Sequence, residues 1–306
     1  MNGSAVCAPI AMEFARQHLS FDDIAAEESA TGWNTDNAYK LLITGEYQEP
    51  LKLTRADVPE QTTGEGNPQS TDVPHRDSFI IASKPVDLII ATEPSIDERE
   101  LAHRYDVDLL AAPIAADAFV FITHRENPVN NLSTEQVRKI YTGEITNWKE
   151  VGGSDLEIVP YQRDRNSGSQ TAMESMVMHD LAMMEPKTAK VRSISMSALT
   201  EAVAAEYDND RQFAIGYSYK YYIDKLYINK DIKILSIDGI YPDNSAILSE
   251  SYPFTAYYYA VIRGADRNEL GGEFLDWIQS DEGRACITQA GYCPGCGHNA
   301  LLKKIK

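Results

Sequence analysis

Short apolar runs alternate along this chain with segments whose apolar residues recur at helical spacing. The apolar runs predict strands over residues 86–91, 109–114, 118–122, 156–161, 214–217 and 257–262. The helical spacing predicts helices over residues 6–14, 34–45, 96–103, 133–143, 172–178 and 274–278. Strands that alternate with helices in this way indicate an α/β fold with largely parallel sheets. The intervening residues 46–78 are polar and predict an exposed loop.

Several of the predicted helices begin just after a loop that carries glycine or hydroxyl groups. These loops contain Gly3-Ser4-Ala5, Asn34-Thr35, Thr92-Glu93-Pro94-Ser95 and residues 163–171. The first backbone N–H groups of a helix lack intrahelical partners and carry the positive end of the helix dipole, so each loop is suited to hold an anion. Ordinary helix capping uses the same residue types and is the alternative for each loop.

The loop over residues 163–171 has the most donors. Ser167 and Ser169 are able to cap the following helix while their hydroxyls donate to an oxyanion. Gly168 lets the backbone come close to a ligand, and Arg163 offers a planar, permanently charged fork for two oxygens. We therefore expect this loop to bind an anion, the alternative being a capped turn with a solvated arginine.

Composition narrows the class of protein. A chain of 306 residues is long enough for a full core divided between two lobes, and 43% hydrophobic with 24% charged residues describes an ordinary globular protein. The formal net charge of −18 argues against nucleic acid and against anionic membrane surfaces as partners. It does not argue against a buried anion, because local donors and dipoles govern a buried site.

The sequence predicts neither a membrane span nor a metal site. No apolar stretch reaches the length of a membrane span, and residues 1–7 lack the basic and apolar parts of an export signal, so we expect any such signal to be absent from this sequence. Cys286, Cys293, Cys296 and His298 have the residue types of a zinc site, but disulfides or free thiols, Cys7 included, are the alternatives. We predict no metal and no cofactor.

Several motifs together resemble the phosphate-binding proteins of ABC importers, a family of extracytoplasmic solute receptors. The most specific are residues 127–133 (NPVNNLS) and 140–148 (IYTGEITNW). Residues 163–169 resemble the family's R-x-x-x-S-G-[TS] phosphate loop, and residues 274–283 with Gly291-Tyr292 resemble its closing segment. The similarity extends from about residue 2 to residue 294.

This resemblance implies a two-lobe fold of the periplasmic-binding-protein type (type II), with the ligand in the cleft between lobes. Lobe I would contain residues 1–117 plus 257–306, and lobe II residues 118–256. Residues 118–122 and 257–262 would be the two hinge strands that cross between them.

The resemblance also implies which residues touch the ligand. They are Gly3, Ser4, Ala5, Thr35, Thr92, Glu93, Arg163, Ser167, Gly168 and Ser169. Glu93 stands where many relatives have an aspartate that accepts a hydrogen bond from protonated phosphate, which sulfate does not offer at neutral pH. The alternative for Glu93 is a solvated acid in the first turn of a helix. Asn2 and Ala5 depart from the family's first loop.

The function implied is binding of inorganic phosphate for delivery to the permease of an ABC importer. We expect a monomeric receptor without catalysis, located in the periplasm or anchored at the cell surface as a lipoprotein, and no nucleic-acid partner. The alternatives are a receptor for sulfate, molybdate or tungstate, and an adhesion or signalling protein that retains the receptor fold. An enzyme is disfavoured because Ser167-Gly168-Ser169 is not a G-x-S-x-G elbow and none of the six histidines sits in a recognisable motif.

Overall fold

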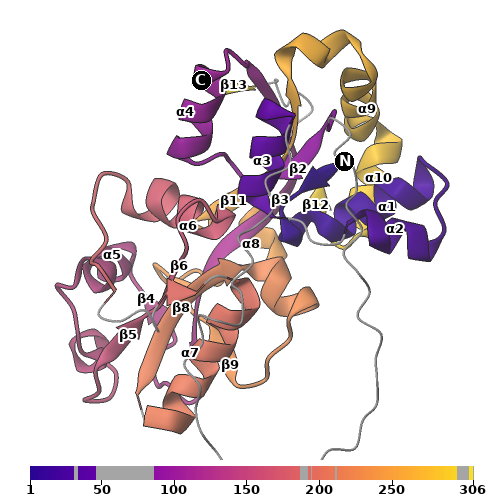
Figure 1. Cartoon of the computed structure of the whole chain (residues 1–306). Helices are drawn as coiled ribbons and strands as arrows, with labels where there is room; N and C mark the ends of the chain where they lie inside the picture. The colour runs from indigo at the N-terminus through magenta and orange to yellow at the C-terminus, as the bar shows by residue number, and fades with distance from the viewer. Residues whose placement is uncertain are drawn as a thin grey trace, which may run out of the picture.

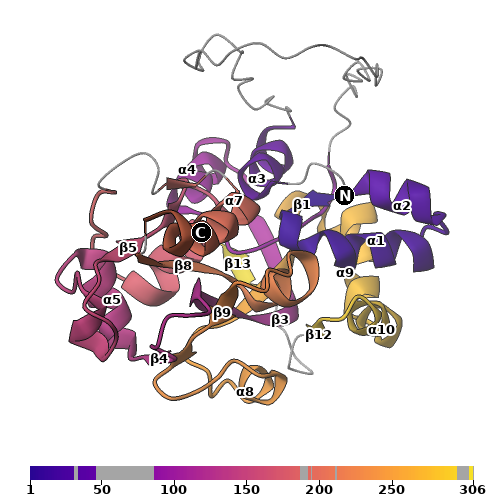
Figure 2. The same cartoon turned by 90° about the horizontal axis from the view of Figure 1, so that it is seen from below.

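The computed structural model describes residues 1–30, 34–45, 86–186, 192–193, 195–210, 212–294 and 303–305. The predicted loop over residues 46–78 lies outside them. The described chain forms two groups of helices on either side of long central strands (Figure 1). Figure 2 shows helices α1, α2, α9 and α10 gathered at one end of these strands and α5 and α8 at the other. Within this part of the chain, no helix is both long and apolar enough to cross a membrane.

The central sheet has nine strands among the described residues and follows the order β1-β2-β11-β3-β8-β5. These strands are β1 (Asn2–Gly3), β2 (Ile89–Ala91), β11 (Thr255–Arg263), β3 (Leu109–His124), β8 (Phe213–Tyr219) and β5 (Ile158–Pro160). Three more strands pair with β3: β9 (Ile232–Ile234), β12 (Cys293–Pro294) and β13 (Lys303–Ile305). Two smaller sheets pair β4 (Asn131–Leu132) with β10 (Ser236–Ile237) and β6 (Gln162–Arg163) with β7 (Arg192–Ser193).

The sequence prediction was wrong on two points of this sheet. Residues 109–114 and 118–122 were expected as separate strands, but they form the single strand β3. The sheet is also not largely parallel, because β3 runs antiparallel to β11, β8 and β9. The register between β3 and β11 shifts where Tyr259 pairs with Pro113 and Tyr258 with Ala115, so Ile114 has no partner there. A bulge lets the strand continue past a proline, which has no N–H for the ladder.

Strand β3 changes partner midway along its length. Residues 109–118 pair with β11, whereas residues 119–123 pair with β8. Figure 1 shows β3 and β11 passing from one group of helices to the other. The mixed α/β, two-lobe architecture expected from the sequence is therefore confirmed.

Helix boundaries follow local capping signals. Asn34 caps α3 (Thr35–Thr44) through Asn37 N–H at 3.2 Å, and Gly45 ends the helix at φ 72°. A capping box of Ser133 and Gln136 opens α5 (Thr134–Thr142). The other helices are α1 (Ala8–Gln17), α2 (Asp23–Ser29), α4 (Ile96–Arg104), α6 (Gly168–Ala172), α7 (Met196–Asp210), α8 (Asn244–Leu248), α9 (Leu270–Gln279) and α10 (Asp281–Gln289). Short 3₁₀ or π turns are η1 (Ala5–Cys7), η3 (Trp148–Val151), η4 (Met173–Met178), η6 (Tyr222–Leu226) and η7 (Gly264–Asn268).

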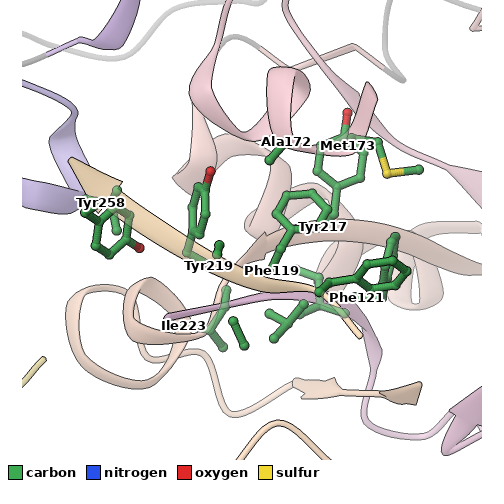
Figure 3. Close-up of a cluster of buried hydrophobic side chains, with 14 of the residues drawn as sticks. Phe119, Phe121, Ala172, Met173, Tyr217, Tyr219, Ile223 and Tyr258 are labelled. Atoms are coloured by element: carbon green, nitrogen blue, oxygen red, sulfur yellow. The ribbon is translucent and has the colours of Figure 1, made fainter. Parts of the chain in front are cut away.

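An aromatic layer forms the core beneath α6. The ring of Phe119 lies 5.5 Å from that of Tyr217 and 5.7 Å from that of Tyr219, centroid to centroid, and all three residues are buried. Figure 3 shows Tyr217 and Tyr219 extending from the sheet with their hydroxyls toward the helical segment that carries Ala172 and Met173. Tilted and edge-on ring contacts of this kind stabilise a core beyond the area they bury. The layer fixes the distance between the start of α6 and the sheet beneath it.

Asp117 ties the crossing strands together where β3 changes partner. Its buried carboxylate accepts hydrogen bonds from Tyr258 Oη at 2.6 Å, Ala118 N at 2.7 Å and Tyr221 N at 3.2 Å. Burial raises the pKa of Asp117 to about 6, against the opposing effect of these hydrogen bonds. One carboxylate thus links β3, β11 and the segment after β8.

Glu98 is a second buried carboxylate, and it makes stability depend on pH. Its Oε2 accepts from Ser95 N at 2.6 Å, while its Oε1 is buried without a hydrogen-bond partner within the described structure. Burial, aided by the charge of Asp36, raises the pKa of Glu98 from 4.5 to about 8. Between these values the folded chain binds more protons than the unfolded chain, so the free energy of unfolding falls as pH rises.

We therefore expect Glu98→Gln to flatten the loss of stability between about pH 6 and pH 8, because a neutral amide has no proton to release. Urea unfolding of both proteins at each end of that range measures the effect. Glu100→Gln, an exposed change on the same helix, is the control and is expected to leave the slope unchanged. An equal slope in Glu98→Gln and the unmodified protein would contradict the assignment.

Candidate anion-binding site

Three of the loops predicted to hold an anion meet at Gly168. A Cβ atom placed on this glycine would lie 2.3 Å from Thr92 Oγ1 and 3.1 Å from Thr35 Oγ1. Thr35 is the first residue of α3, Thr92 follows β2, and Gly168 opens α6. All three residues are buried. Segments far apart in the sequence therefore bring two hydroxyls against the start of one helix, at a position that only glycine fits.

Arg163 provides a buried positive charge beside this point. The residue is 7% exposed, and its Nη1 donates to Ser169 Oγ at 3.1 Å. Its backbone N–H donates to Tyr217 Oη at 2.9 Å and to Gln170 Oε1 at 3.1 Å, which fixes the end of β6. Burial lowers the pKa of the guanidinium, but an arginine pKa starts so high that the charge is kept at neutral pH.

The two serines of this loop have different roles. Ser167 Oγ accepts from Gln170 N at 3.2 Å and so caps α6, as predicted. Ser169 does not act as the cap, because its hydroxyl accepts from Arg163 instead. Between Arg163 and Ser167 the chain turns at Asn166, which has a φ of 65°. Both serine hydroxyls keep a proton that they can donate to a ligand.

The first loop lies beside the third because their strands are parallel neighbours. Gly3 pairs with Ile90, and Ser4 N donates to Ile90 O at 2.9 Å. The side chain of Ser4 is 7% exposed and stands at the cap position of η1 without making a capping hydrogen bond. Ala5 is exposed. Ser4 thus follows β1 at the edge of the sheet where Thr92 follows β2.

Thr92 has a polar atom without a well-formed hydrogen bond. Its carbonyl accepts from Tyr39 Oη at 2.8 Å, but its buried Oγ1 makes no hydrogen bond of normal geometry within the described structure, the hydroxyl of Tyr219 being its polar neighbour. Buried hydroxyls are rarely left in this state, since the lost hydration costs about 1–3 kcal/mol. A bound oxyanion would supply the acceptor that Thr92 lacks.

The carboxylate of Glu93 contacts Tyr259 and Arg99 rather than the residues around Gly168. Oε1 accepts from Tyr259 Oη at 3.3 Å, and Oε2 lies 3.9 Å from Arg99 Nη2. The side chain is 43% exposed. Its hydrogen bond therefore joins the loop after β2 to β11. Within the described structure, no hydrogen bond ties it to Thr35, Arg163 or Ser167.

Sequence reasoning missed the tyrosines that shape the site. Tyr219 Oη donates to the carbonyl of Gly168 at 3.2 Å, and Tyr217 Oη donates to Gln170 Oε1. Both belong to β8, for which the sequence predicted only a buried strand over residues 214–217. The available signal was the alternation of tyrosine along residues 217–222, which places Tyr217 and Tyr219 on one face of the strand.

The cysteines do not contribute to this site in the described structure. Cys7 and Cys286 are buried free thiols. Cys296 and His298, part of the zinc alternative, lie outside the described residues. Among the residues that are described, no group of three or more His, Cys, Asp or Glu side chains is placed to hold a metal ion.

Comparison with known proteins identifies the family. Residues 58–282, well over half of the chain, match the model of the PBP superfamily domain. The phosphate-binding protein PstS of Bacillus subtilis is 28% identical over 287 residues, covering 89% of this chain and 84% of that protein. PstS of Borreliella burgdorferi is 29% identical over 178 residues, covering 58% of this chain and 63% of the relative, which is less than two thirds of its length.

Solved structures share the fold over nearly the whole chain. A structure from Clostridium perfringens with bound phosphate has a TM-score of 0.63 at 21% identity and covers 96% of this chain and 98% of that one. An ABC-type phosphate transport receptor from Vibrio cholerae has a TM-score of 0.59 at 20% identity, with 95% and 98% covered. The resemblance drawn from the sequence motifs is confirmed. The chain belongs to the PBP superfamily.

Proposed function

We propose that this protein is an extracytoplasmic receptor that binds inorganic phosphate and delivers it to an ABC importer, without catalysis. The observation that carries the proposal is the convergence of Thr35 and Thr92 on Gly168, next to Ser169, which binds the buried guanidinium of Arg163. The names of the two curated relatives as phosphate-binding proteins support the choice of anion. We further propose a monomer, located in the periplasm or anchored at the cell surface.

The site would hold phosphate by replacing its water with fixed donors. Arg163 supplies positive charge, and the hydroxyls of Ser4, Thr35, Thr92 and Ser167 supply neutral donors. Hydrogen bonds to a charged oxyanion are stronger than those between neutral groups, and burial strengthens them further. The set of donors thereby offsets the cost of dehydrating the anion.

We propose that binding is coupled to closure of two lobes, residues 1–117 plus 257–306 and residues 118–256, about β3 and β11. We call Thr35, Thr92, Arg163 and Gly168 with their loops the cradle. One contact outside the cradle supports closure across this division. Asp97 at the start of α4 accepts from Arg165 Nη2 at 2.6 Å and from Asn166 Nδ2 at 3.1 Å. These hydrogen bonds hold the pKa of Asp97 below its usual range. A ligand held by both lobes would shift the equilibrium to the closed state.

Asp97→Asn is expected to speed phosphate release by at most about fivefold, because an exposed ion pair contributes only about 0.2–1 kcal/mol. The effect should shrink at high salt, which screens exposed charges. Stopped-flow release measured at low and high salt tests this, with Glu100→Gln on the same helix as control. Release that is unchanged at low salt would show that the contact does not stabilise the closed state.

Calorimetry on purified protein stripped of ligand tests the function itself. Phosphate is expected to bind, and sulfate and molybdate are tested as competitors. Preference for sulfate or molybdate would make the protein a receptor for another oxyanion. Absence of binding to any tetrahedral oxyanion would refute the proposal and favour an adhesion or signalling role.

A further inference from the structure

A side chamber adjoins the cradle at Gly168. It encloses about 250 Å³, and both Thr92 and Gly168 belong to its wall as well as to the cradle. One water takes up about 30 Å³ in the liquid, so the chamber has room for a small organic group. A substituent on an oxyanion held in the cradle would therefore have space to extend into it.

The chamber wall is rich in hydroxyls and has one charge of each sign. Tyr219 and Tyr259 contribute rings and hydroxyls, and Tyr257, whose hydroxyl donates to Glu250, contributes its ring. Ser175 of η4 adds a hydroxyl, and Glu93 and Lys303 supply an acceptor and a donor. The hydrogen bond from Tyr259 Oη to Glu93 Oε1 holds the carboxylate at this wall. Figure 3 shows the hydroxyl of Tyr219 directed toward the segment that carries Ala172, another wall residue.

This chemistry matches a short polyol. Each hydroxyl of a polyol both donates and accepts, so it pairs with tyrosine and serine hydroxyls, with the carboxylate of Glu93 and with the ammonium of Lys303. The tyrosine rings offer apolar faces to the C–H groups of the same molecule. The tyrosine hydroxyls already donate within the protein, so each keeps a lone pair that accepts from a polyol hydroxyl, an interaction that a wholly apolar substituent cannot make.

We propose that the chamber is a subsite for the alcohol part of a phosphate monoester of a short polyol, whose phosphate group occupies the cradle. This inference rests on the proposed function, since it uses the same cradle for the phosphate. It widens the ligands of the protein from inorganic phosphate to small hydroxylated phosphate esters. It also gives Glu93 a role at the subsite rather than in the cradle.

Calorimetry with inorganic phosphate and with glycerol 3-phosphate separates the two proposals. The unmodified protein is expected to bind both, the ester within about 100-fold of phosphate. Ser175→Trp places an indole at the chamber wall and should weaken ester binding by about tenfold or more, with phosphate affinity changed by less than about twofold. Ser245→Trp, on the exposed face of α8, is the matched control and should change neither.

Lys303→Met is a second variant that removes one polar wall group without adding bulk. It should weaken the ester about threefold or more and spare phosphate. Phosphate binding without ester binding in the unmodified protein would overturn this inference and leave the proposed function intact. Equal ester affinity in Ser175→Trp and the unmodified protein would also overturn it. Failure to bind phosphate at all would overturn both proposals.

Discussion

Arg163→Ala is expected to remove most of the affinity for phosphate. Truncating one partner of a buried charge pair costs about 2–5 kcal/mol, which corresponds to a roughly 30- to 4,000-fold rise in Kd. The structure places this cation at 7% exposure, beside the hydroxyl of Ser169. Titration calorimetry with ligand-stripped protein measures the loss.

Two companion variants make the result for Arg163 interpretable. Arg163→Lys keeps the charge but loses the planar fork, so an intermediate affinity is expected. Arg125→Ala removes an arginine whose side chain is 54% exposed and should leave binding unchanged. Circular dichroism would check that each variant is folded. Phosphate affinity unchanged in folded Arg163→Ala would show that the site has been assigned to the wrong loop.

Gly168→Ala is expected to have the second largest effect. The added Cβ would lie 2.3 Å from Thr92 Oγ1, closer than any real contact of this type, so Thr92 or α6 must shift. Overpacking of this kind costs about 1–3 kcal/mol, and here the displacement falls on groups that we propose as donors to the anion. We expect phosphate affinity to fall by roughly 5- to 150-fold, as measured by calorimetry.

A double-mutant cycle identifies the cause of this loss. Thr92→Ala removes Oγ1, and the remaining Cβ would be 3.4 Å from the new methyl group, which is ordinary contact. The change Gly168→Ala should therefore cost less when it is made in a Thr92→Ala background, where the remaining close approach is 3.1 Å to Thr35 Oγ1. Additive losses in the double variant would mean that the glycine matters for its backbone and not for its fit against Thr92.

Local signals in the sequence were sufficient to predict where the helices begin and end. Asn34 and Gly45 lie at the two ends of α3, and Ser133 with Gln136 caps α5, within the predicted ranges 34–45 and 133–143, because a cap involves only residues three or four positions apart. Ser167 caps α6 for the same reason. The sequence motifs also indicated the family, and the match to the PBP superfamily model confirmed that resemblance.

The sheet could not be read in the same way. The apolar runs at 109–114 and 118–122 merge into β3, and a bulge at Ile114, opposite Tyr258 and Tyr259, lets this strand continue past Pro113. Whether neighbouring strands run parallel or antiparallel depends on which distant segment lies alongside. Strands β3 and β11 are more than a hundred residues apart in sequence, and no local pattern encodes their pairing.

The sequence by itself determined which loops carry anion-binding chemistry: the glycine, hydroxyl and arginine residues of those loops are local properties of the chain. Only the tertiary structure decided how they combine. Burial of Arg163, the contact of Gly168 with Thr35 and Thr92, and the orientation of Glu93 toward Tyr259, 166 residues away, all depend on long-range packing. Packing sets burial and distance, and these decide whether a donor stays solvated or faces a ligand.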